Sequence, residues 1–307
     1  MTYRSIFLAL GVVAAILVGG PALAADPHGD DHSNTVDPIH HVVDANYLEI
    51  PWPNAHLAKK IYLPTLVTVH FTDDVQIELA ITKHVVVMWI VAILLIVFVT
   101  GIGRKASADK APTGTVNFLE VFVVWMRDNV TVPAMGPHWG RKLLPYFLTV
   151  FFFILSGNLF GLIPYSATFT GNLAVTAAMA STSFILIQAI AIREAGFGGW
   201  IKHLTAGVHP ALWPIMIPVE FLGLFTKPFA LAVRLFANMS AGHIVIVSLL
   251  GLIFIFGHVA VAGLSVPFAV FIYLLEILVA FIQAFIFTML TAVFTGMGVH
   301  SHHAEAH

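Results

Sequence analysis

Long runs of apolar residues, interrupted by short polar segments, occupy most of the chain after residue 82. The first three runs are residues 85–102, 143–163 and 173–192, each close to the ~20 residues that a helix needs to cross a bilayer. The fourth run, residues 211–298, is long enough for two extended helices, and we expect their turn at residues 257–263, which begin and end with glycine. The pattern predicts an all-α membrane protein with about five transmembrane helices, the last two forming a long, tilted antiparallel hairpin.

A shorter segment between the first two runs has an amphipathic pattern. Over residues 116–130, Phe118, Val121, Phe122 and Trp125 recur at the spacing of one helical face, while the charged residues lie elsewhere. We therefore expect an additional helix that rests on the membrane surface.

The first 24 residues resemble a secretory signal peptide. Arg4 precedes the apolar run of residues 6–18, and Ala22-Leu23-Ala24 forms an A-x-A cleavage site. An uncleaved helix is the alternative, but this run is shorter than the ~20 residues that a spanning helix needs. We expect residues 1–24 to be a signal peptide that is cleaved after Ala24.

Residues 25–82 are polar and contain a cluster of histidines, and we expect them to form a periplasmic segment. The spacing typical of zinc ligands does not recur, which favours a solvated tail over a metal site. Residues 66–71 and 75–81 flank Asp73-Asp74 and predict a small β-hairpin.

Basic residues next to the apolar runs indicate the orientation in the membrane. They are Arg104, Lys105 and Lys110 after the first run, Arg141 and Lys142 before the second, and Arg193 and Lys202 after the third. The positive-inside rule places these segments in the cytoplasm. The amino terminus is then periplasmic, in agreement with the signal peptide, and residues 300–307 form a His-rich cytoplasmic tail. We expect a multi-pass protein of a bacterial inner membrane.

Composition supports this assignment. Of the 307 residues, 59% are hydrophobic and 10% are charged, whereas soluble domains usually carry about a quarter charged residues. The net charge of −2 says nothing about nucleic acid, but the sequence has no basic cluster that would bind it. The absence of cysteine excludes disulfides and thiolate chemistry. We expect no cofactor and no bound metal.

The last hydrophobic region, taken as residues 205–299, nevertheless contains ionisable groups. Its formal charges are Glu220, Lys227, Arg234 and Glu276, and its histidines are His209, His243 and His258. A charge at the centre of a spanning helix costs at least ~2.5 kcal/mol, so such residues face a protein interior or a water-filled path. Lys227 is close enough to a helix end to snorkel. Arg234 has only apolar and small neighbours for several turns, apart from Asn238, and we interpret it as functional.

Helix geometry separates these groups. Glu220, Lys227 and Arg234 are seven residues apart and share one face, with Asn238 close to it. His243 lies on the opposite side of the helix. Along the axis, Glu220 and His243 are about 21 Å and 13 Å from Arg234, in opposite directions. Polar groups at two depths and on two faces, with a fixed cation between them, favour two separate access paths over one open pore.

Arginine suits the position between two paths because its guanidinium stays protonated, whereas a buried lysine can lose its proton. Arg234 can therefore attract a carboxylate without exchanging a proton with it, which blocks direct leakage between the paths. No acidic residue lies close to Arg234 in sequence, so we expect a partner protein to supply the carboxylate.

Two stretches closely resemble subunit a of the F-type ATP synthase membrane sector. The first runs from Lys227-Pro228 through RLFANMSAGH at residues 234–243, and the second is LLEILVAFIQAFIFTML at residues 274–290. A looser similarity extends over residues 83–298 and includes SGNLFGLIPY at residues 156–165. The resemblance implies an ATP synthase a-subunit domain over residues 83–299, with two offset half-channels beside a rotating ring of c subunits. It also implies a b-type peripheral stalk and other synthase subunits as partners, and a non-catalytic role within the complex that makes ATP.

The resemblance assigns roles to individual residues. Arg234 would face the ring carboxylate, with Asn238 and Gln283 as polar companions, and Glu220 would be the acidic group on the cytoplasmic exit side. His243 and Glu276 occupy two positions that members fill with one acid and one histidine, in either order. The pairs Arg234–Gln283 and His243–Glu276 have nearly equal sums of residue numbers, as facing residues of an antiparallel hairpin do. We predict that both pairs meet across the hairpin.

Other functions fit the sequence less well. A self-contained channel or secondary transporter would be expected to show inverted repeats or matching helix breaks, and the sequence has no internal repeat. An intramembrane metallohydrolase would need a motif such as H-E-x-x-H, which is absent. Either H⁺ or Na⁺ fits these residues, because the ion-binding carboxylate would lie on the ring.

Overall fold

The computed structural model describes residues 47–50, 59–62, 65–72, 75–80, 82–103, 114–163, 168–204 and 212–300. The predicted signal peptide and the tail after His300 lie outside these residues. The basic residues at 104–110 also lie outside them.

Five helices in the described part of the chain are long and apolar enough to cross a membrane, which confirms the prediction. The helices are α3 (Lys83–Gly103), α5 (Val132–Gly161), α6 (Leu173–Leu204), α7 (Trp213–Phe256) and α8 (Val259–His300). A short helical turn, η2 (Phe169–Gly171), lies between α5 and α6. The apolar segment that contains α5 begins at Val116, in the helix before it, and is broken inside α5 at Gly136, whose φ of 75° and ψ of 170° are not helical.

That preceding helix, α4 (Thr115–Met126), occupies the segment predicted to be amphipathic. It ends four residues earlier than expected, because residues Arg127–Thr131 form the π-helical turn η1. Its apolar face is divided. The rings of Phe122 and Trp125 pack 5.8 Å from Phe152 and 5.5 Å from Phe285, on α5 and α8 respectively, whereas Phe118 and Val121 are exposed. The helix therefore docks on the bundle with one part of this face and leaves the other part for lipid.

Two small antiparallel sheets precede the first long helix. Strands β3 (Thr65–Thr72) and β4 (Val75–Ala80) form the predicted hairpin. Strands β1 (Tyr47–Ile50) and β2 (Lys59–Tyr62) form a second sheet that the sequence did not predict. Four-residue strands place only two side chains on each face, which is too few to show an alternating pattern.

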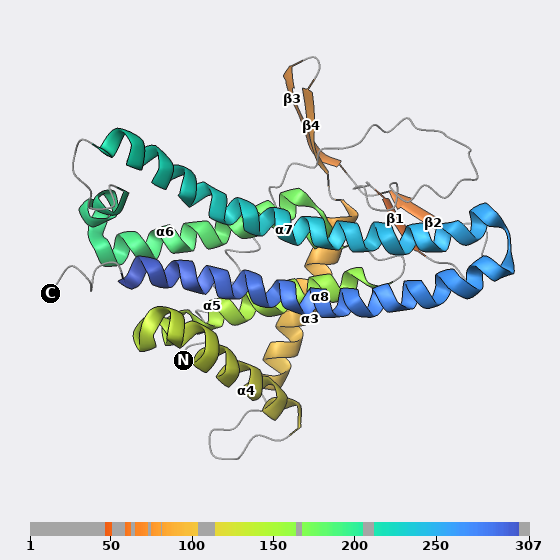
Figure 1. The fold of residues 1–307 in the computed structure, drawn as a ribbon, viewed down its shortest axis with the longest axis horizontal. Helices are drawn as coiled ribbons and strands as arrows, with labels where there is room; N and C mark the ends of the chain where they lie inside the picture. The colour runs from red at the N-terminus through yellow and green to blue at the C-terminus, as the bar shows by residue number, and fades with distance from the viewer. Residues whose placement is uncertain are drawn as a thin grey trace.

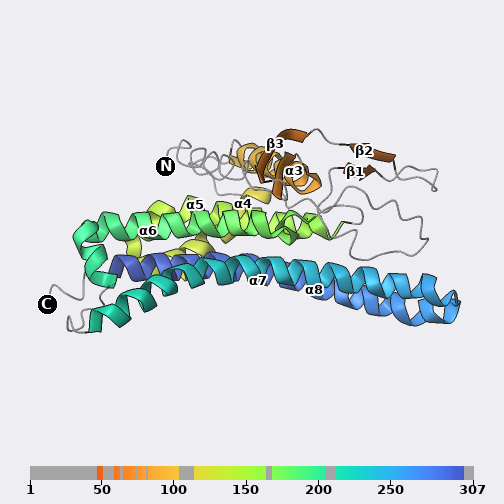
Figure 2. The same ribbon diagram turned by 90° about the horizontal axis from the view of Figure 1, so that it is seen from above.

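Helices α7 and α8 form the predicted antiparallel hairpin and lie side by side toward their connection, whereas the start of α7 diverges from the end of α8 (Figures 1 and 2). The turn is shorter than expected, because α8 already begins at Val259. Gly257 ends α7 with φ 61° and ψ 12°, a left-handed conformation that glycine adopts without a steric penalty.

The hairpin is too long to stand upright in a membrane. The 44 residues of α7 extend about 66 Å, compared with about 30 Å for the hydrocarbon core of a bilayer. Figure 1 shows that α3 runs at a large angle to α7 and α8. If α3 is perpendicular to the plane of the bilayer, the hairpin must therefore cross the bilayer at a strong tilt.

The core of the bundle lies where α5 packs against α8. Phe147, Phe151 and Ile154 of α5 are fully buried, as is Ala284 of α8. Near the end of α8, Gly296 lies directly against the backbone carbonyl of Ala134, where any β-carbon would overlap with it. Small residues of this kind let helix backbones approach closely, which is how membrane helices gain packing energy without a hydrophobic driving force.

Candidate functional site

Arg234 and Asn238 lie on an exposed face of α7. Leu231, Leu235 and Met239, on the other side of the same helix, are buried in the bundle. Among the described residues, no carboxylate forms an ion pair with Arg234. The guanidinium is thus directed away from the core of the chain.

Glu276 has the opposite environment. It is only 7% exposed, and its carboxyl group lies directly against Gly242 of α7. A β-carbon on Gly242 would come within 2.7 Å of the Glu276 carboxyl carbon, so a larger residue at 242 would force this carboxyl group to move. Oε2 of Glu276 is buried and accepts no hydrogen bond from the described residues. A buried acceptor without a partner costs about 1–3 kcal/mol, so this oxygen is an unusual feature of the hairpin.

The contact between Gly242 and Glu276 agrees with the predicted register of the hairpin. Gly242 is adjacent in sequence to His243, which is half-buried. Nearer the other end of the hairpin, the Lys227 ammonium of α7 lies 5.1 Å from the centre of the Phe294 ring of α8. Following this register along both helices places Gln283 at the level of Arg234. The direct pairings of His243 with Glu276 and of Arg234 with Gln283 stay predictions.

The remaining two predicted residues differ in environment. Gln283 is 6% exposed and belongs to the buried side of α8, unlike Arg234 and Asn238. Glu220 is half-buried near the start of α7, about 21 Å along the helix axis from Arg234. Pro228 lies inside α7 between Glu220 and Arg234. Along the axis of the hairpin, the carboxyl groups of Glu220 and Glu276 therefore lie on opposite sides of Arg234.

Comparison with known proteins identifies the family. The sequence model of the family described as ATP synthase A chain matches residues 85–296. The ATP synthase subunit a of Chloroherpeton thalassium is 51% identical over 278 residues, which cover 89% of this chain and 80% of the relative. The corresponding subunit of Myxococcus xanthus is 54% identical over 236 residues, covering 76% of this chain and 78% of the relative. The chain belongs to the ATP synthase A chain family.

The region matched to the ATP synthase A chain family contains nearly all of the five long helices and every predicted site residue. It does not include the two small sheets. Among the described residues, no three His, Cys, Asp or Glu side chains lie close enough together to hold a metal ion.

Structure adds a buried polar cluster that sequence reasoning did not assign. The hydroxyl of Thr170, in η2, donates a 2.7 Å hydrogen bond to Oδ1 of Asn158 on α5, and both residues are fully buried. The Asn158 amide donates at 3.4 Å to the carbonyl of Ala280, one helical turn from Glu276. The only sequence signal was an asparagine inside an apolar run, within the family-like motif at residues 156–165. This cluster ties α5 to α8 close to the Glu276 level.

Proposed function

We propose that this chain is the proton-translocating stator subunit of a rotary ATP synthase, in which Arg234 separates two offset half-channels. The observation that carries the proposal is the exposed guanidinium of Arg234 on a helix whose neighbouring turns, apart from Asn238, contain only apolar and small residues. A charge in this position is costly in lipid, so a protein surface that offers a carboxylate is its natural partner. A ring of c subunits with one acid per protomer supplies such a surface repeatedly as it turns.

The buried carboxyl of Glu276 and the neighbouring His243 form the periplasmic half-channel. Glu276 lies inside the bundle, where it is shielded from lipid, and histidine exchanges protons near neutral pH. Glu220, on the other side of the Arg234 level, belongs to the cytoplasmic half-channel. A proton entering by one path reaches the other only by riding on the ring, because Arg234 holds its own proton and repels another cation.

The chain itself performs no chemistry on ATP. It acts with the c-ring, a b-type peripheral stalk and the other synthase subunits in a bacterial inner membrane. We place the amino terminus in the periplasm and the carboxyl terminus in the cytoplasm, with a signal peptide at residues 1–24, a polar segment at 25–82, the membrane domain at 83–299 and a tail at 300–307. Exposed apolar side chains along α3, such as Ile93 and Val97, support contact with lipid or with a membrane-embedded partner.

Arg234→Ala and Arg234→Lys test the proposal in inverted membrane vesicles. Both variants should insert normally, as judged by immunoblot, and should lower ATP-driven proton pumping by more than about tenfold. Arg141→Lys, an exposed arginine outside the hairpin, serves as the control and should pump normally. Pumping by Arg234→Lys at the wild-type rate would show that a permanent cation is not required there. The intact complex should also yield a small two-span proteolipid on purification, which a self-contained transporter would not.

A further inference from the structure

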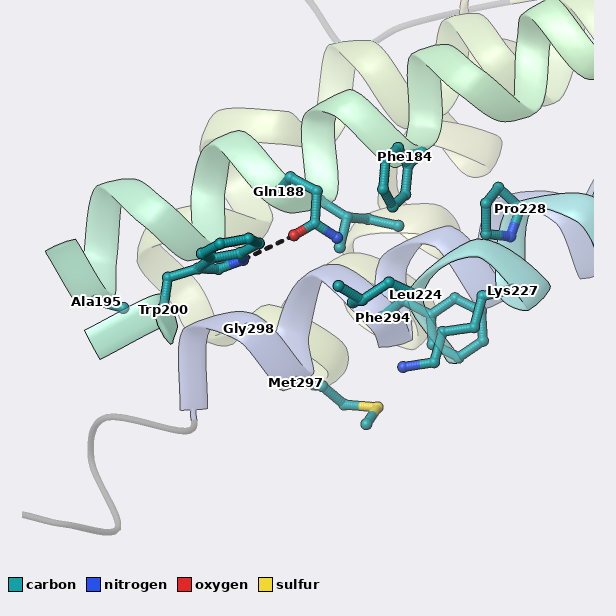
Figure 3. Close-up of a pocket in the computed structure, with 12 residues that line it drawn as sticks. Phe184, Gln188, Ala195, Trp200, Leu224, Lys227, Pro228, Phe294, Met297 and Gly298 are labelled. Carbon is teal, nitrogen blue, oxygen red and sulfur yellow. Dashed lines mark hydrogen bonds between the residues drawn. The ribbon is translucent and has the colours of Figure 1, made fainter. Parts of the chain in front are cut away.

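A small cavity lies between α6, α7 and α8, away from Glu276 and His243. It has a volume of about 60 Å³, and its walls are mainly apolar and aromatic. Three polar side chains line it: Gln188 and Trp200 of α6, and Lys227 of α7 (Figure 3). None of the three has a role in the proposed proton path.

A glycine hinge builds one wall of this cavity. Gln188 and Trp200 are 12 residues apart, which would separate them by about 18 Å along a straight helix. Instead, the indole Nε1 of Trp200 lies 2.9 Å from Oε1 of Gln188. The helix breaks at Gly196, whose φ of 65° and ψ of 164° belong to a region that is essentially restricted to glycine. The break turns the end of α6 back over the cavity.

The hydrogen bond from Trp200 fixes the orientation of the Gln188 amide. An indole nitrogen only donates, so the atom of Gln188 that faces it must be the carbonyl oxygen. The amide nitrogen is consequently turned away from Trp200, and Figure 3 shows it on the side of the cavity. Gln188 therefore offers the cavity N–H donors.

Lys227 also lines the cavity and carries a positive charge. Its ammonium lies 5.1 Å from the centre of the Phe294 ring, an attraction that leaves its N–H groups available. Among the described residues, no carboxylate forms an ion pair with Lys227. The cavity thus presents one cation and one set of amide donors without a matching acceptor, which is the arrangement expected of an anion site.

The surroundings identify the source of the anion. Phe197 is 65% exposed and stacks on Trp200 with ring centroids 6.0 Å apart. Tryptophan is enriched at the membrane–water interface. The basic residues that flank the helices place this end of the bundle at the cytoplasmic leaflet, which is rich in anionic lipids. Phe184, Leu224 and Met297 provide an apolar wall for an acyl chain. We propose that this cavity binds the phosphate group of an anionic phospholipid, held by Lys227 and Gln188.

Lipid binding by the purified full-length chain tests the proposal. Native mass spectrometry would count the lipids retained when the chain, in a zwitterionic detergent, is titrated with phosphatidylglycerol or phosphatidylcholine. The wild-type chain should retain phosphatidylglycerol preferentially. Lys227→Gln removes the cation and should weaken phosphatidylglycerol binding by about fivefold or more.

Gln188→Glu is the sharper variant, because it keeps the acceptor for Trp200 and the side-chain shape but replaces the amide donor with a carboxylate oxygen. It should weaken phosphatidylglycerol binding at least as strongly as Lys227→Gln and leave phosphatidylcholine binding unchanged. Lys142→Gln is the matched control. Lys142 also lies over an aromatic ring, 4.5 Å from the centre of Trp139, but it does not line the cavity. Its removal should alter binding by less than about twofold.

Three outcomes would overturn the proposal. The first is equal retention of the two lipids by the wild-type chain, and the second is equal loss of phosphatidylglycerol in the Lys142 and Lys227 variants. The third is displacement of phosphatidylglycerol by inorganic phosphate at the same concentration, which would indicate a site for free anions.

Discussion

The two polar regions of the α7–α8 hairpin face in different directions. Arg234 and Asn238 of α7 are exposed, whereas Glu276 and Gln283 of α8 are 7% and 6% exposed and lie within the bundle. Burial of Glu276 depends on Gly242, which leaves space for its carboxyl group, while Arg234 shares its exposed face with Asn238. The comparison separates two requirements. A group that meets a moving partner must lie on the outer face, and a group that conducts within the chain must be shielded by it.

The strongest test of this division exchanges the two members of the inner pair. His243→Glu and Glu276→His should each lower ATP-driven proton pumping by more than about tenfold, because each leaves two like groups in the half-channel. The double variant restores one acid and one histidine and should pump better than either single variant. Proton uptake by inverted vesicles measures the effect. A double variant no better than the poorer single variant would show that the residues do not act together.

Gly242→Ala should have a smaller but still large effect. The new β-carbon would overlap with the carboxyl group of Glu276 and displace it from its place in the bundle. We expect pumping to fall several-fold while the complex remains assembled.

Two further variants make the Gly242 test specific. Gly251→Ala, on the same helix, introduces a β-carbon that meets no atom within 4 Å and should leave pumping unchanged. Glu276→Asp shortens the acid, so adding it to Gly242→Ala should restore part of the lost rate. If Gly251→Ala and Gly242→Ala were equally impaired, the defect would lie in α7 itself and not in the space around Glu276.

A change in the buried polar cluster should affect stability more than transport. Thr170→Val removes the donor to Oδ1 of Asn158 and leaves a buried acceptor unsatisfied, at a cost of about 1–3 kcal/mol. Thermal unfolding of the purified chain should show a melting temperature lowered by a few degrees. Thr226→Val is the control, because the exposed hydroxyl of Thr226 bonds only to carbonyls of its own helix. Equal melting temperatures for wild type and Thr170→Val would mean that this cluster does not hold α5 against α8.

The sequence predicted the features that depend on local pattern. Apolar runs of membrane-spanning length identified the long helices, and the glycine at 257 marked the turn of the hairpin. Arg234 and Glu276 stood out because charges are rare in such runs. The register of the hairpin was predicted from two residue pairs that the family resemblance singled out, and the contact of Gly242 with Glu276 agrees with it.

Features that depend on contacts between distant residues were not predictable. The bond between Thr170 and Asn158 requires η2 to fold against α5, and the bond between Trp200 and Gln188 requires the break at Gly196. Residues 196, 198 and 199 are glycines, which signals a break, but not the direction in which the chain turns. The direction is set by the side chains that the end of α6 meets on folding.

The least perturbing test concerns which compartment each end of the hairpin faces. The chain contains no cysteine, so a single introduced cysteine can be labelled without background. A cysteine at Asn46 should react with an impermeant maleimide added to spheroplasts, because the amino-terminal segment is expected to be periplasmic. A cysteine at Ser107 should react only after the membrane is permeabilised, because Arg104, Lys105 and Lys110 favour a cytoplasmic location for that loop. If the amino terminus is periplasmic and each of the five helices crosses the membrane once, α7 runs from the cytoplasmic to the periplasmic side. The turn at Gly257 is then periplasmic, and the cavity near Lys227 is on the cytoplasmic side. The opposite labelling pattern would exchange the two half-channels and move the proposed lipid site to the outer leaflet, where anionic lipid is scarcer, so one experiment bears on both proposals.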